Sequence, residues 1–424
     1  MPIRENVIVV GGGLTGSIAA LSAAETGASV RLVSYKKSTL RFASGLVDVL
    51  GYPNGDGPVS DPFAALSSLP DDHPYSLVGE GAIRDGLSLF DEVTGDGYRG
   101  SHTDANALVP TYGGTVKPTA RYPTASAAGL ASDARSMLVV GFRSLTDFDA
   151  RLVSDHLEAA GVPFDVRGAE LSFPKEYRAD AKVTRFAKAL DTDEEIRFAG
   201  RSVGMREAVA ETVKPRLKGA ERVGFPSFLG DEHASEVRTD LESQLGAEVF
   251  EIPMGPPSFP GLRLEDALFA ALDDAGVRIS SGNPVVDYEA DGDRLQAVYV
   301  DRKRTRVPYH ADEFVLATGG LVGKGIDSDR SRVREPIFGS YVPHPSDRYD
   351  WFDTDAFGDH PFAKFGVVVD DEMRVVGVEN SPRFSNLRAA GAVVGGADGA
   401  AEKSSSGISL ATGVVAGRGA GASI

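Results

Sequence analysis

The feature that most constrains the fold is a glycine-rich turn near the amino terminus. Residues 7–33 have the pattern of an apolar strand, an alanine-rich helix and a second strand. Gly11, Gly13 and Gly16 follow the first strand with the G-x-G-x-x-G spacing. Such glycines allow a tight turn, close approach of main chain to a phosphate, and close packing of helix on strand. The segment predicts a βαβ unit that binds a nucleotide phosphate at the helix N-terminus, the alternative being a turn that only packs.

The residue that ends the second strand departs from the usual dinucleotide-binding pattern. NAD- and FAD-binding chains carry an acidic residue about 20 positions after the glycines, where it binds the 2′-hydroxyl of the adenosine ribose. Here that position is Ser34, followed by Tyr35, Lys36 and Lys37. Two explanations stay open from these residues: Lys36 and Lys37 hold the 2′-phosphate of NADP, or the bound nucleotide has no adenosine.

Three later segments predict a large cofactor contacted from several sides. LATGG at 316–320 and NLRAAGAVVGG at 386–396 place paired glycines after apparent strands, where main chain can lie close to a flat ring or a phosphate. SSSGISLATG at 404–413 adds a helix start whose N–H groups would stabilise an anionic reduced ring. A flavin fits these segments better than a nicotinamide that binds and leaves. The alternatives are independent turns and an ordinary capped helix.

Composition limits the classes of partner and chemistry. The 424 residues include 44 Lys and Arg against 61 Asp and Glu, a net charge of −17. This charge disfavours nucleic acid as a partner and is typical of a high-salt cytoplasm or of a simply acidic surface. The absence of cysteine excludes disulfides, thiolate nucleophiles and cysteine-bound clusters, and the spacing of the seven histidines predicts no metal site. Neither a signal peptide nor a membrane-spanning run is expected.

The order of the elements predicts an α/β protein with two discontinuous domains. Strand and helix patterns recur at 137–161, 221–246 and 260–279, a hairpin at 285–300, and a closing strand, turn and helix at 385–417. The fold class expected is a Rossmann-like FAD/NAD(P)-binding-type flavoprotein fold with an inserted, discontinuous α/β cap domain. The predicted flavin-binding domain comprises residues 1–60, 247–335 and 366–424. The predicted cap, a substrate or interface domain, comprises residues 61–246 with 336–365.

Five segments spread from the first strand to the last helix carry a family resemblance. They are VIVVGGGLTGSIAAL, RFASGLVDVLG, PSFPGLRL, LATGG and NLRAAGAVVGG. Together they resemble the B subunits of anaerobic glycerol-3-phosphate dehydrogenase, and FASGLVDVL at 42–50 is the most specific of them. The wider group is similar to the fumarate reductase and succinate dehydrogenase flavoproteins.

The resemblance implies an FMN-containing member of a three-part respiratory complex. In this family the A subunit holds FAD and is the usual site of glycerol 3-phosphate oxidation, and the C subunit holds iron–sulfur clusters and attaches the pair to the cytoplasmic membrane. Electrons then pass to a quinone. The chain would bind FMN, or alternatively FAD, noncovalently. It would take part in oxidising sn-glycerol 3-phosphate to dihydroxyacetone phosphate, in the cytoplasm and peripheral on the inner face of the membrane through a partner.

The resemblance also places the flavin contacts. They are expected at Gly11, Gly13, Thr15, Gly16, Ser44, Gly45, Gly319, Gly320, Gly395, Gly396, Ser406 and Gly407. No catalytic residue is assigned, and the candidates for binding a substrate phosphate, each with the alternative of a structural charge, are Lys117, Arg121, Arg383 and Arg388. Two other functions stay open: a noncatalytic flavoprotein that relays electrons or supports assembly within the complex, and a stand-alone FAD- or NADP-dependent oxidoreductase acting on another small molecule.

Overall fold

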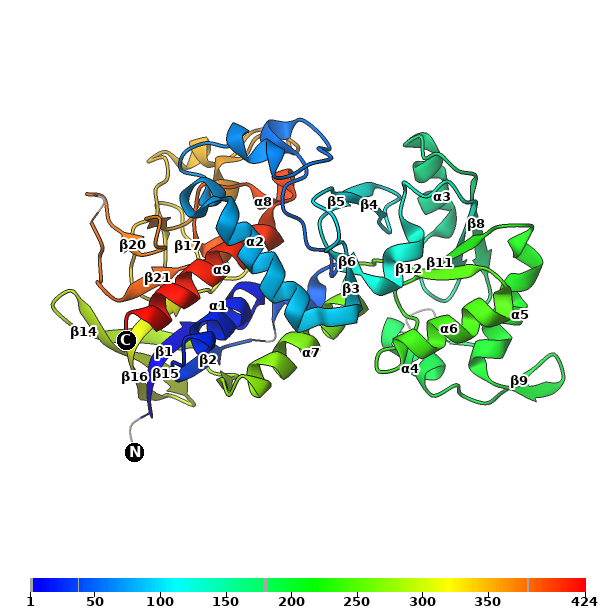
Figure 1. Cartoon of the computed structure of the whole chain (residues 1–424), viewed down its shortest axis with the longest axis horizontal. Helices are drawn as coiled ribbons and strands as arrows, with labels where there is room; N and C mark the ends of the chain where they lie inside the picture. The colour runs from blue at the N-terminus through cyan, green and yellow to red at the C-terminus, as the bar shows by residue number, and fades with distance from the viewer. Residues whose placement is uncertain (1–2, 37, 178–181, 380) are drawn as a thin grey trace. The chain divides into compact units, whose positions relative to one another are not determined.

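The computed structural model describes residues 3–36, 38–177, 182–379 and 381–424, and the chain divides into two compact units (Figure 1). Unit 1 comprises residues 1–40, 48–95 and 265–424, and unit 2 comprises residues 41–47 and 96–264. Both units are discontinuous in sequence, as expected of an inserted domain. Whether they act as a flavin-binding domain and a cap stays a prediction.

The boundaries of the two units differ from the predicted ones in four main segments. Residues 61–95 and 336–365, predicted for the cap, lie in unit 1, whereas residues 247–264 and 41–47, predicted for the flavin-binding domain, lie in unit 2. Helix α2 (Pro74–Thr94) explains the first difference, because its buried face packs against helix α9 (Ser405–Ala422). Strand β12 (Glu248–Ile252) explains the third, because it extends the sheet of unit 2 in parallel with β11.

Unit 1 is built on a seven-stranded sheet in the order β13-β2-β1-β16-β15-β14, with β21 paired to β16. β1 pairs in parallel with β2 and β16, whereas β14, β15 and β16 form an antiparallel meander. The predicted βαβ unit and the predicted hairpin are both confirmed. The strands are β1 (Ile3–Val10), β2 (Val30–Ser34), β13 (Arg278–Ser281), β14 (Val285–Asp291), β15 (Arg294–Arg302), β16 (Thr305–Leu316) and β21 (Leu387–Ala389), with the short pairs β17 (Asp327–Ser328) with β18 (Val333–Arg334) and β19 (Val368–Val369) with β20 (Val375–Val376).

Helices α1 (Leu14–Glu25), α9 and α2 stack in that order against the sheet of unit 1 (Figure 1). Helix α9 approaches α1 closely through glycine: an added Cβ at Gly417 would lie 2.2 Å from the carbonyl oxygen of Ala19. The two remaining helices that reach into this unit are α7 (Phe259–Asp274) and the short α8 (Gly399–Glu402). Neither α9 nor any other helix in the described ranges has both the length and the apolar composition needed to span a bilayer.

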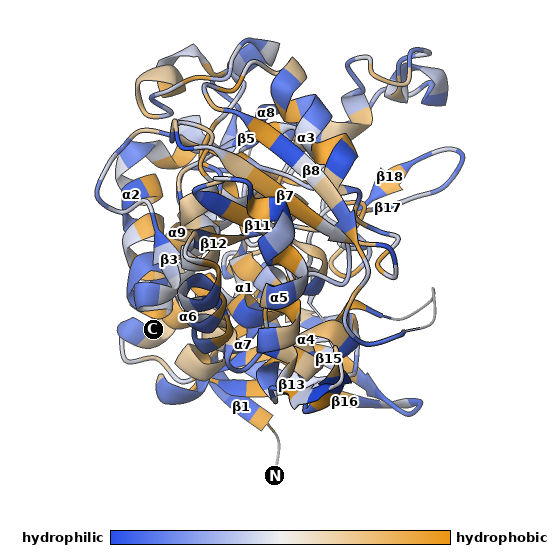
Figure 2. Cartoon of the chain, turned by 90° about the vertical axis from the view of Figure 1, so that its right-hand side faces the viewer, coloured by the Kyte–Doolittle hydropathy of each residue, from blue (hydrophilic) through white to orange (hydrophobic). Residues whose placement is uncertain are grey.

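Unit 2 contains a four-stranded parallel sheet in the order β12-β11-β7-β8. The strand and helix patterns predicted at 137–161 and 221–246 are confirmed as β7 with α3 and β11 with α6. Figure 2 shows hydrophobic colour along β7, whose residues are all buried, and mixed colours on the covering helices. The elements are β3 (Tyr98–Arg99), β4 (Ala107–Pro110), β5 (Val116–Thr119), β6 (Tyr122–Pro123), β7 (Met137–Phe142), α3 (Ala150–Ala159), β8 (Val166–Leu171), α4 (Val183–Asp191), β9 (Ile196–Phe198), β10 (Arg201–Val203), α5 (Met205–Leu217), β11 (Arg222–Pro226), α6 (Ala234–Leu245) and β12.

A buried carboxylate ties three strands of unit 1 together. Glu5 on β1 is ion-paired with Arg31 on β2 at 2.7 Å and with Arg278 on β13 at 2.6 Å, and its side chain is 1% exposed. Burial by itself raises the pKa of Glu5, but the hydrogen bonds from Arg278 and Arg31 outweigh it and hold the pKa below the ordinary carboxyl value of 4.5. The two ion pairs of Glu5 therefore stabilise the folded chain only while Glu5 is ionised.

We expect the unfolding free energy to decrease as the pH falls below 4.5, because the unfolded state then binds a proton at Glu5 that the folded state resists. The contribution is complete above pH 4.5 and is lost as the pH falls through the lowered pKa. Glu5→Gln should cost about 2 kcal/mol at pH 7 and should flatten this acid limb. Urea unfolding from pH 3 to 7 measures both effects, with Glu25→Gln on the surface as the matched control. An unchanged acid limb in Glu5→Gln would contradict the assignment.

Candidate functional site

Three glycine turns of unit 1 begin at the same edge of its sheet. In the parallel pairings, Val10 at the end of β1 is the register partner of Leu316 at the end of β16. Leu316 is in turn the register partner of Ala389 at the end of β21. The turns that follow these residues start at Gly11, Gly319 and Gly391. Because ligands of open α/β sheets bind outside the carboxyl ends of parallel strands, this edge is the candidate cofactor site.

Gly11 and Gly16 are required by the packing of the turn itself. Gly11 has a φ of +124°, and an added Cβ would lie 2.0 Å from the carbonyl oxygen of Ala317. An added Cβ at Gly16 would lie 1.8 Å from the carbonyl oxygen of Gly11. No larger residue fits either position without moving main chain, so these glycines hold α1 against the strands.

Gly13 has a different environment, which suits a phosphate. It is the N-cap of α1 with a φ of −88°, and the nearest atom to an added Cβ is Thr39 Oγ1 at 4.0 Å. In this fully described turn, no side chain caps α1 and no acidic residue lies in its first turn. The first N–H groups of α1 are therefore left for a ligand, and the positive end of the helix favours an anion there. The residues present fit a nucleotide phosphate.

The hydroxyl of Ser34 is hydrogen-bonded within the chain. It donates to the carbonyl of Lys36 at 2.9 Å, and the residue is 8% exposed. An added Cβ at Gly12 would lie 2.7 Å from Ser34 Oγ, so the second strand and the turn are in close contact at this point. Lys36 lies with Nζ 5.4 Å from the ring centroid of Tyr35, and Lys37 lies outside the described residues.

The second and third turns approach each other and α1. Gly319 has a φ of +79°, and an added Cβ at Gly320 would lie 2.7 Å from the carbonyl oxygen of Ala392. Gly391 has a φ of +73°, and an added Cβ there would lie 2.1 Å from Thr15 Oγ1. Thr15 is thus buried under the third turn, which Gly391 makes possible. Gly391 was missed from the sequence, although it directly follows the strand in NLRAAG and that position was the available signal.

Gly395 and Gly396 use their N–H groups within unit 1. Gly395 donates to the carbonyl of Val367 at 3.1 Å, and Gly396 donates to the carbonyl of Lys364 at 3.1 Å. Gly396 also has a φ of +98°, with 2.5 Å between an added Cβ and the carbonyl oxygen of Asp72. These contacts explain both glycines by packing, so their role at a flavin stays a prediction.

The start of α9 is tied to the segment around Asp48. The N–H of Asp48 donates to Ser406 Oγ at 2.7 Å, and the N–H of Gly407 donates to the carbonyl of Asp48 at 2.8 Å. An added Cβ at Gly407 would lie 2.1 Å from the hydroxyl of Tyr75. The Ser406 hydroxyl and the Gly407 N–H thus already have partners in the fold, and their predicted contact with a flavin is untested.

Ser44 and Gly45 belong to unit 2. Gly45 has a φ of +77°, its carbonyl accepts a hydrogen bond from the hydroxyl of Tyr98 at 2.8 Å, and an added Cβ would lie 2.6 Å from Pro260 Cβ. Ser44 Oγ accepts a hydrogen bond from the N–H of Leu46 at 3.3 Å. Both remain predicted cofactor contacts.

All four cations considered for a substrate phosphate have partners within the chain, and two of them, Arg388 and Arg121, are also buried. Arg388 is buried and donates to Glu313 Oε2 at 2.5 Å and to Ser423 Oγ at 3.2 Å. Arg121 is buried and donates to the carbonyls of Gly100 and Ala120, each at 3.0 Å. Lys117 lies on β5, and Arg383 is exposed beside the ring of Phe384 and donates to the hydroxyl of Tyr288 at 3.5 Å. The structural alternative therefore applies to Arg388 and Arg121.

Comparisons with known proteins agree with this geometry. The family described as FAD binding domain matches residues 6–408. The chain is 58% identical over 425 residues to a protein of Halobacterium salinarum named as a probable B subunit of anaerobic glycerol-3-phosphate dehydrogenase, covering 100% of this chain and 99% of the relative. It is 28% identical to the B subunit of anaerobic glycerol-3-phosphate dehydrogenase from Pectobacterium atrosepticum, covering 96% of each.

Among solved structures, the chain is similar to 3-ketosteroid Δ1-dehydrogenase from Sterolibacterium denitrificans in complex with 1,4-androstadiene-3,17-dione. The TM-score is 0.45 at 13% identity, covering 99% of this chain and 100% of that one. The family match confirms the predicted flavoprotein fold class and a flavin as the class of cofactor. The extent and identity of the sequence matches show that the chain belongs to the FAD binding domain family and, within it, to the family of anaerobic glycerol-3-phosphate dehydrogenase B subunits.

Proposed function

We propose that this chain is the flavin-binding B subunit of an anaerobic glycerol-3-phosphate dehydrogenase and takes part in oxidising sn-glycerol 3-phosphate to dihydroxyacetone phosphate. The observation that carries the proposal is the identity of 58% over the whole length of a relative so named. The open turn at Gly13 supports it, because a flavin nucleotide needs an anion site of this kind.

The bound flavin is FMN, held noncovalently. FMN has a phosphate for the N-terminus of α1 but no adenosine ribose, in agreement with Ser34, whose hydroxyl is directed to the carbonyl of Lys36. The segment FASG at 42–45 contains no histidine for a covalent link. FAD is the alternative, and the name of the matching family refers to it.

We expect heat-treated pure protein to release FMN, identified by chromatography against FMN, FAD and NADP standards. One FMN per chain supports the proposal. Recovery of FAD or NADP would overturn the FMN assignment, and recovery of no flavin from protein expressed in flavin-rich cells would overturn the function itself.

The residues of unit 1 hold such a cofactor by main chain. The flavin, when bound, supplies a hydride acceptor that can pass electrons onward. The first N–H groups of α1 bind the phosphate, and Gly13 leaves open space in front of them. Gly11, Gly319 and Gly391 let the three turns pack closely at this edge of the sheet. The catalytic base stays unassigned.

The proposed partners are an A subunit that contains FAD, and an iron–sulfur C subunit that anchors the complex. The chain has no cysteine, so a cysteine-bound cluster between this flavin and a quinone must lie on another chain. The relatives are named as B subunits, and such a name denotes one member of an assembly of several chains. We propose that this chain lies on the inner face of the cell membrane through such a partner, and co-purification of a tagged chain from host membranes tests this.

A role as electron relay is a second candidate, favoured by the structural partners of Arg388 and Arg121. A relay needs no substrate base or phosphate ligand. Anaerobic mixing of the isolated flavoprotein with glycerol 3-phosphate separates the two roles. Slow or absent bleaching of the flavin supports the relay, whereas fast stoichiometric bleaching shows that this chain oxidises substrate itself.

A further inference from the structure

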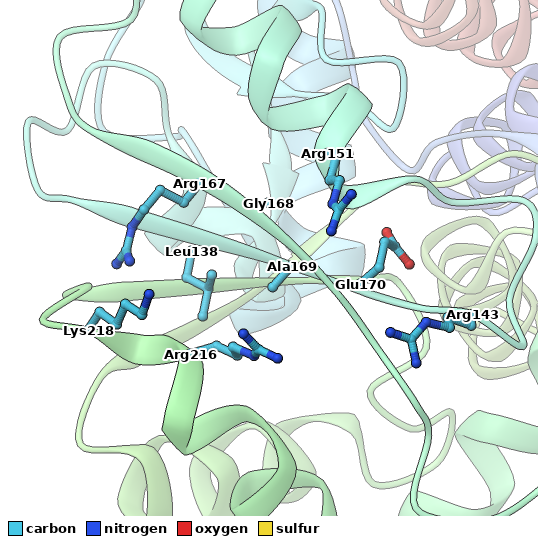
Figure 3. Close-up of a pocket in the computed structure, with 9 residues that line it drawn as sticks. All are labelled: Leu138, Arg143, Arg151, Arg167, Gly168, Ala169, Glu170, Arg216 and Lys218. Atoms are coloured by element: carbon cyan, nitrogen blue, oxygen red, sulfur yellow. The ribbon is translucent and has the colours of Figure 1, made fainter.

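Unit 2 contains a cavity of about 230 Å³ beside the edge strand of its sheet (Figure 3). The lining comes from β7, β8 and the segments around α3 and α5. Five of the nine lining residues are cationic and one is a carboxylate, Glu170: the cations are Arg143, Arg151, Arg167, Arg216 and Lys218. So dense a cluster of positive charge is unexpected in a chain of net charge −17.

Few acidic partners balance these cations. Arg167 donates to the carbonyl of Leu217 at 2.7 Å, and Arg143 donates to Ser172 Oγ at 3.0 Å, so neither forms an ion pair there. Within the described ranges, the exposed residues Arg151, Arg216 and Lys218 form neither an ion pair nor a side-chain hydrogen bond. Elsewhere in unit 2 arginines are paired, as in Arg206 with Glu236 and Asp240. Glu170 interacts electrostatically with Arg143 and Arg151. With five cations against this one carboxylate, the lining keeps a net positive charge.

The cationic groups surround one stretch of β8. In the view of Figure 3, Arg151 approaches the strand from one side, Arg143 and Arg216 lie on the other side, and Arg167 points away. The small side chain of Ala169 leaves room above the strand. One oxygen of Glu170 accepts a hydrogen bond from the N–H of Ala150 at 2.7 Å, so the one carboxylate among the nine lining residues is partly engaged by the start of α3.

The volume of the cavity indicates the size of ligand that it can hold. Pockets for drug-sized ligands and cofactors have volumes of about 300–1,000 Å³, so a cavity of 230 Å³ has the size for a small anion. Guanidinium groups bind tetrahedral oxyanions by paired N–H donors, and phosphate offers several acceptor oxygens to a cluster of this kind. In molar salt the screening length is about 3 Å, so only direct contacts of this type remain effective.

We propose that this cavity is a binding site for a phosphate dianion, either inorganic phosphate or the phosphate group of a small ester, held by Arg151 and Arg216 with Arg143 at the rim. The site lies within unit 2, whereas the flavin-phosphate turn lies in unit 1. The inference does not depend on the proposed dehydrogenase function. The competing explanation is that the cations only protect the edge of β8 from pairing with other strands, and that explanation requires no ligand.

The test is calorimetric titration of the flavin-loaded full-length chain in molar KCl with inorganic phosphate and, separately, with glycerol 3-phosphate. We expect saturable binding with one site per chain in at least one titration. Tighter binding of the ester assigns the site to a phosphorylated metabolite, and equal binding assigns it to phosphate itself. Hydrogen exchange with and without phosphate should show protection at 143–151, 166–171 and 216–218.

Variants distinguish phosphate binding at this site from nonspecific binding to surface arginines. Arg151→Gln with Arg216→Gln should weaken phosphate binding about tenfold or more, whereas Arg197→Gln, which removes an exposed arginine elsewhere in unit 2, should leave it unchanged. Glu170→Gln should tighten binding, because a negative charge is removed beside the anion. Absence of saturable binding in the parent chain, or equal affinity in the double variant, would overturn the site. The flavin content of each variant, measured in parallel, shows whether the dehydrogenase proposal is affected separately.

Discussion

Gly13→Ala is expected to yield a folded protein that has lost its flavin. The added methyl group meets no protein atom closer than Thr39 Oγ1 at 4.0 Å, and a φ of −88° is allowed for alanine. The same methyl group lies where a phosphate must approach the N–H groups of α1. Each lost hydrogen bond to a charged phosphate costs roughly 1.5–3 kcal/mol, so flavin occupancy should fall about tenfold or more. The flavin absorbance per chain, together with the thermal midpoint of the apoprotein, measures the effect.

Two matched glycine variants make this result specific. Gly81→Ala in α2 adds a methyl group with no neighbour within 4 Å and should retain flavin and stability. Gly16→Ala forces a Cβ to 1.8 Å from the carbonyl oxygen of Gly11 and should lower the stability of unit 1 as well as flavin content. If Gly13→Ala kept its full flavin content, the turn would be a packing element only.

Local sequence patterns predicted the elements of the site but not their assembly. The glycines after β1 and the hairpin at 285–300 were visible because turn chemistry and strand alternation act over a few residues. The pairing of β21 with β16 joins residues more than 70 positions apart in sequence, as in Leu316 with Ala389. The position of Gly391 just after the strand in NLRAAG was a local signal for a turn, but nothing local indicates that this turn shares an edge with Gly11.

Charge and burial explain the other differences between prediction and structure. Arg388 and Arg383 look alike in sequence, but one is buried beside Glu313 and the other is exposed. The cavity of unit 2 draws its cations from positions 143 to 218, with no local motif. Residues 336–365 were predicted for the cap, whereas Trp351 packs against His344 and Phe365 within unit 1. The composition of such a segment does not show against which of the two hydrophobic cores it packs.

Arg388→Met should destabilise unit 1 by about 3–5 kcal/mol, because it leaves the Glu313 carboxylate buried without its partner. The two side chains are 5% and 4% exposed, and they join β21 to β16 at 2.5 Å. Replacing both residues, as Glu313→Leu with Arg388→Met, should restore most of the loss, since a buried ion pair replaced by apolar side chains is often neutral. Urea unfolding of the three proteins measures the coupling.

The pH dependence of Arg388→Met distinguishes this structural role from a substrate-binding one. Burial raises the pKa of Glu313, and Arg388 opposes that rise. Without Arg388 the folded state binds a proton at Glu313 at higher pH than the unfolded state does, so the deficit should be largest at neutral pH and shrink as the pH falls. A substrate ligand would behave differently: the single variant would keep its stability at every pH. The double variant distinguishes the two roles of Arg388. If its stability is restored and the assembled complex oxidises glycerol 3-phosphate at an unchanged rate, Arg388 has no role in binding substrate.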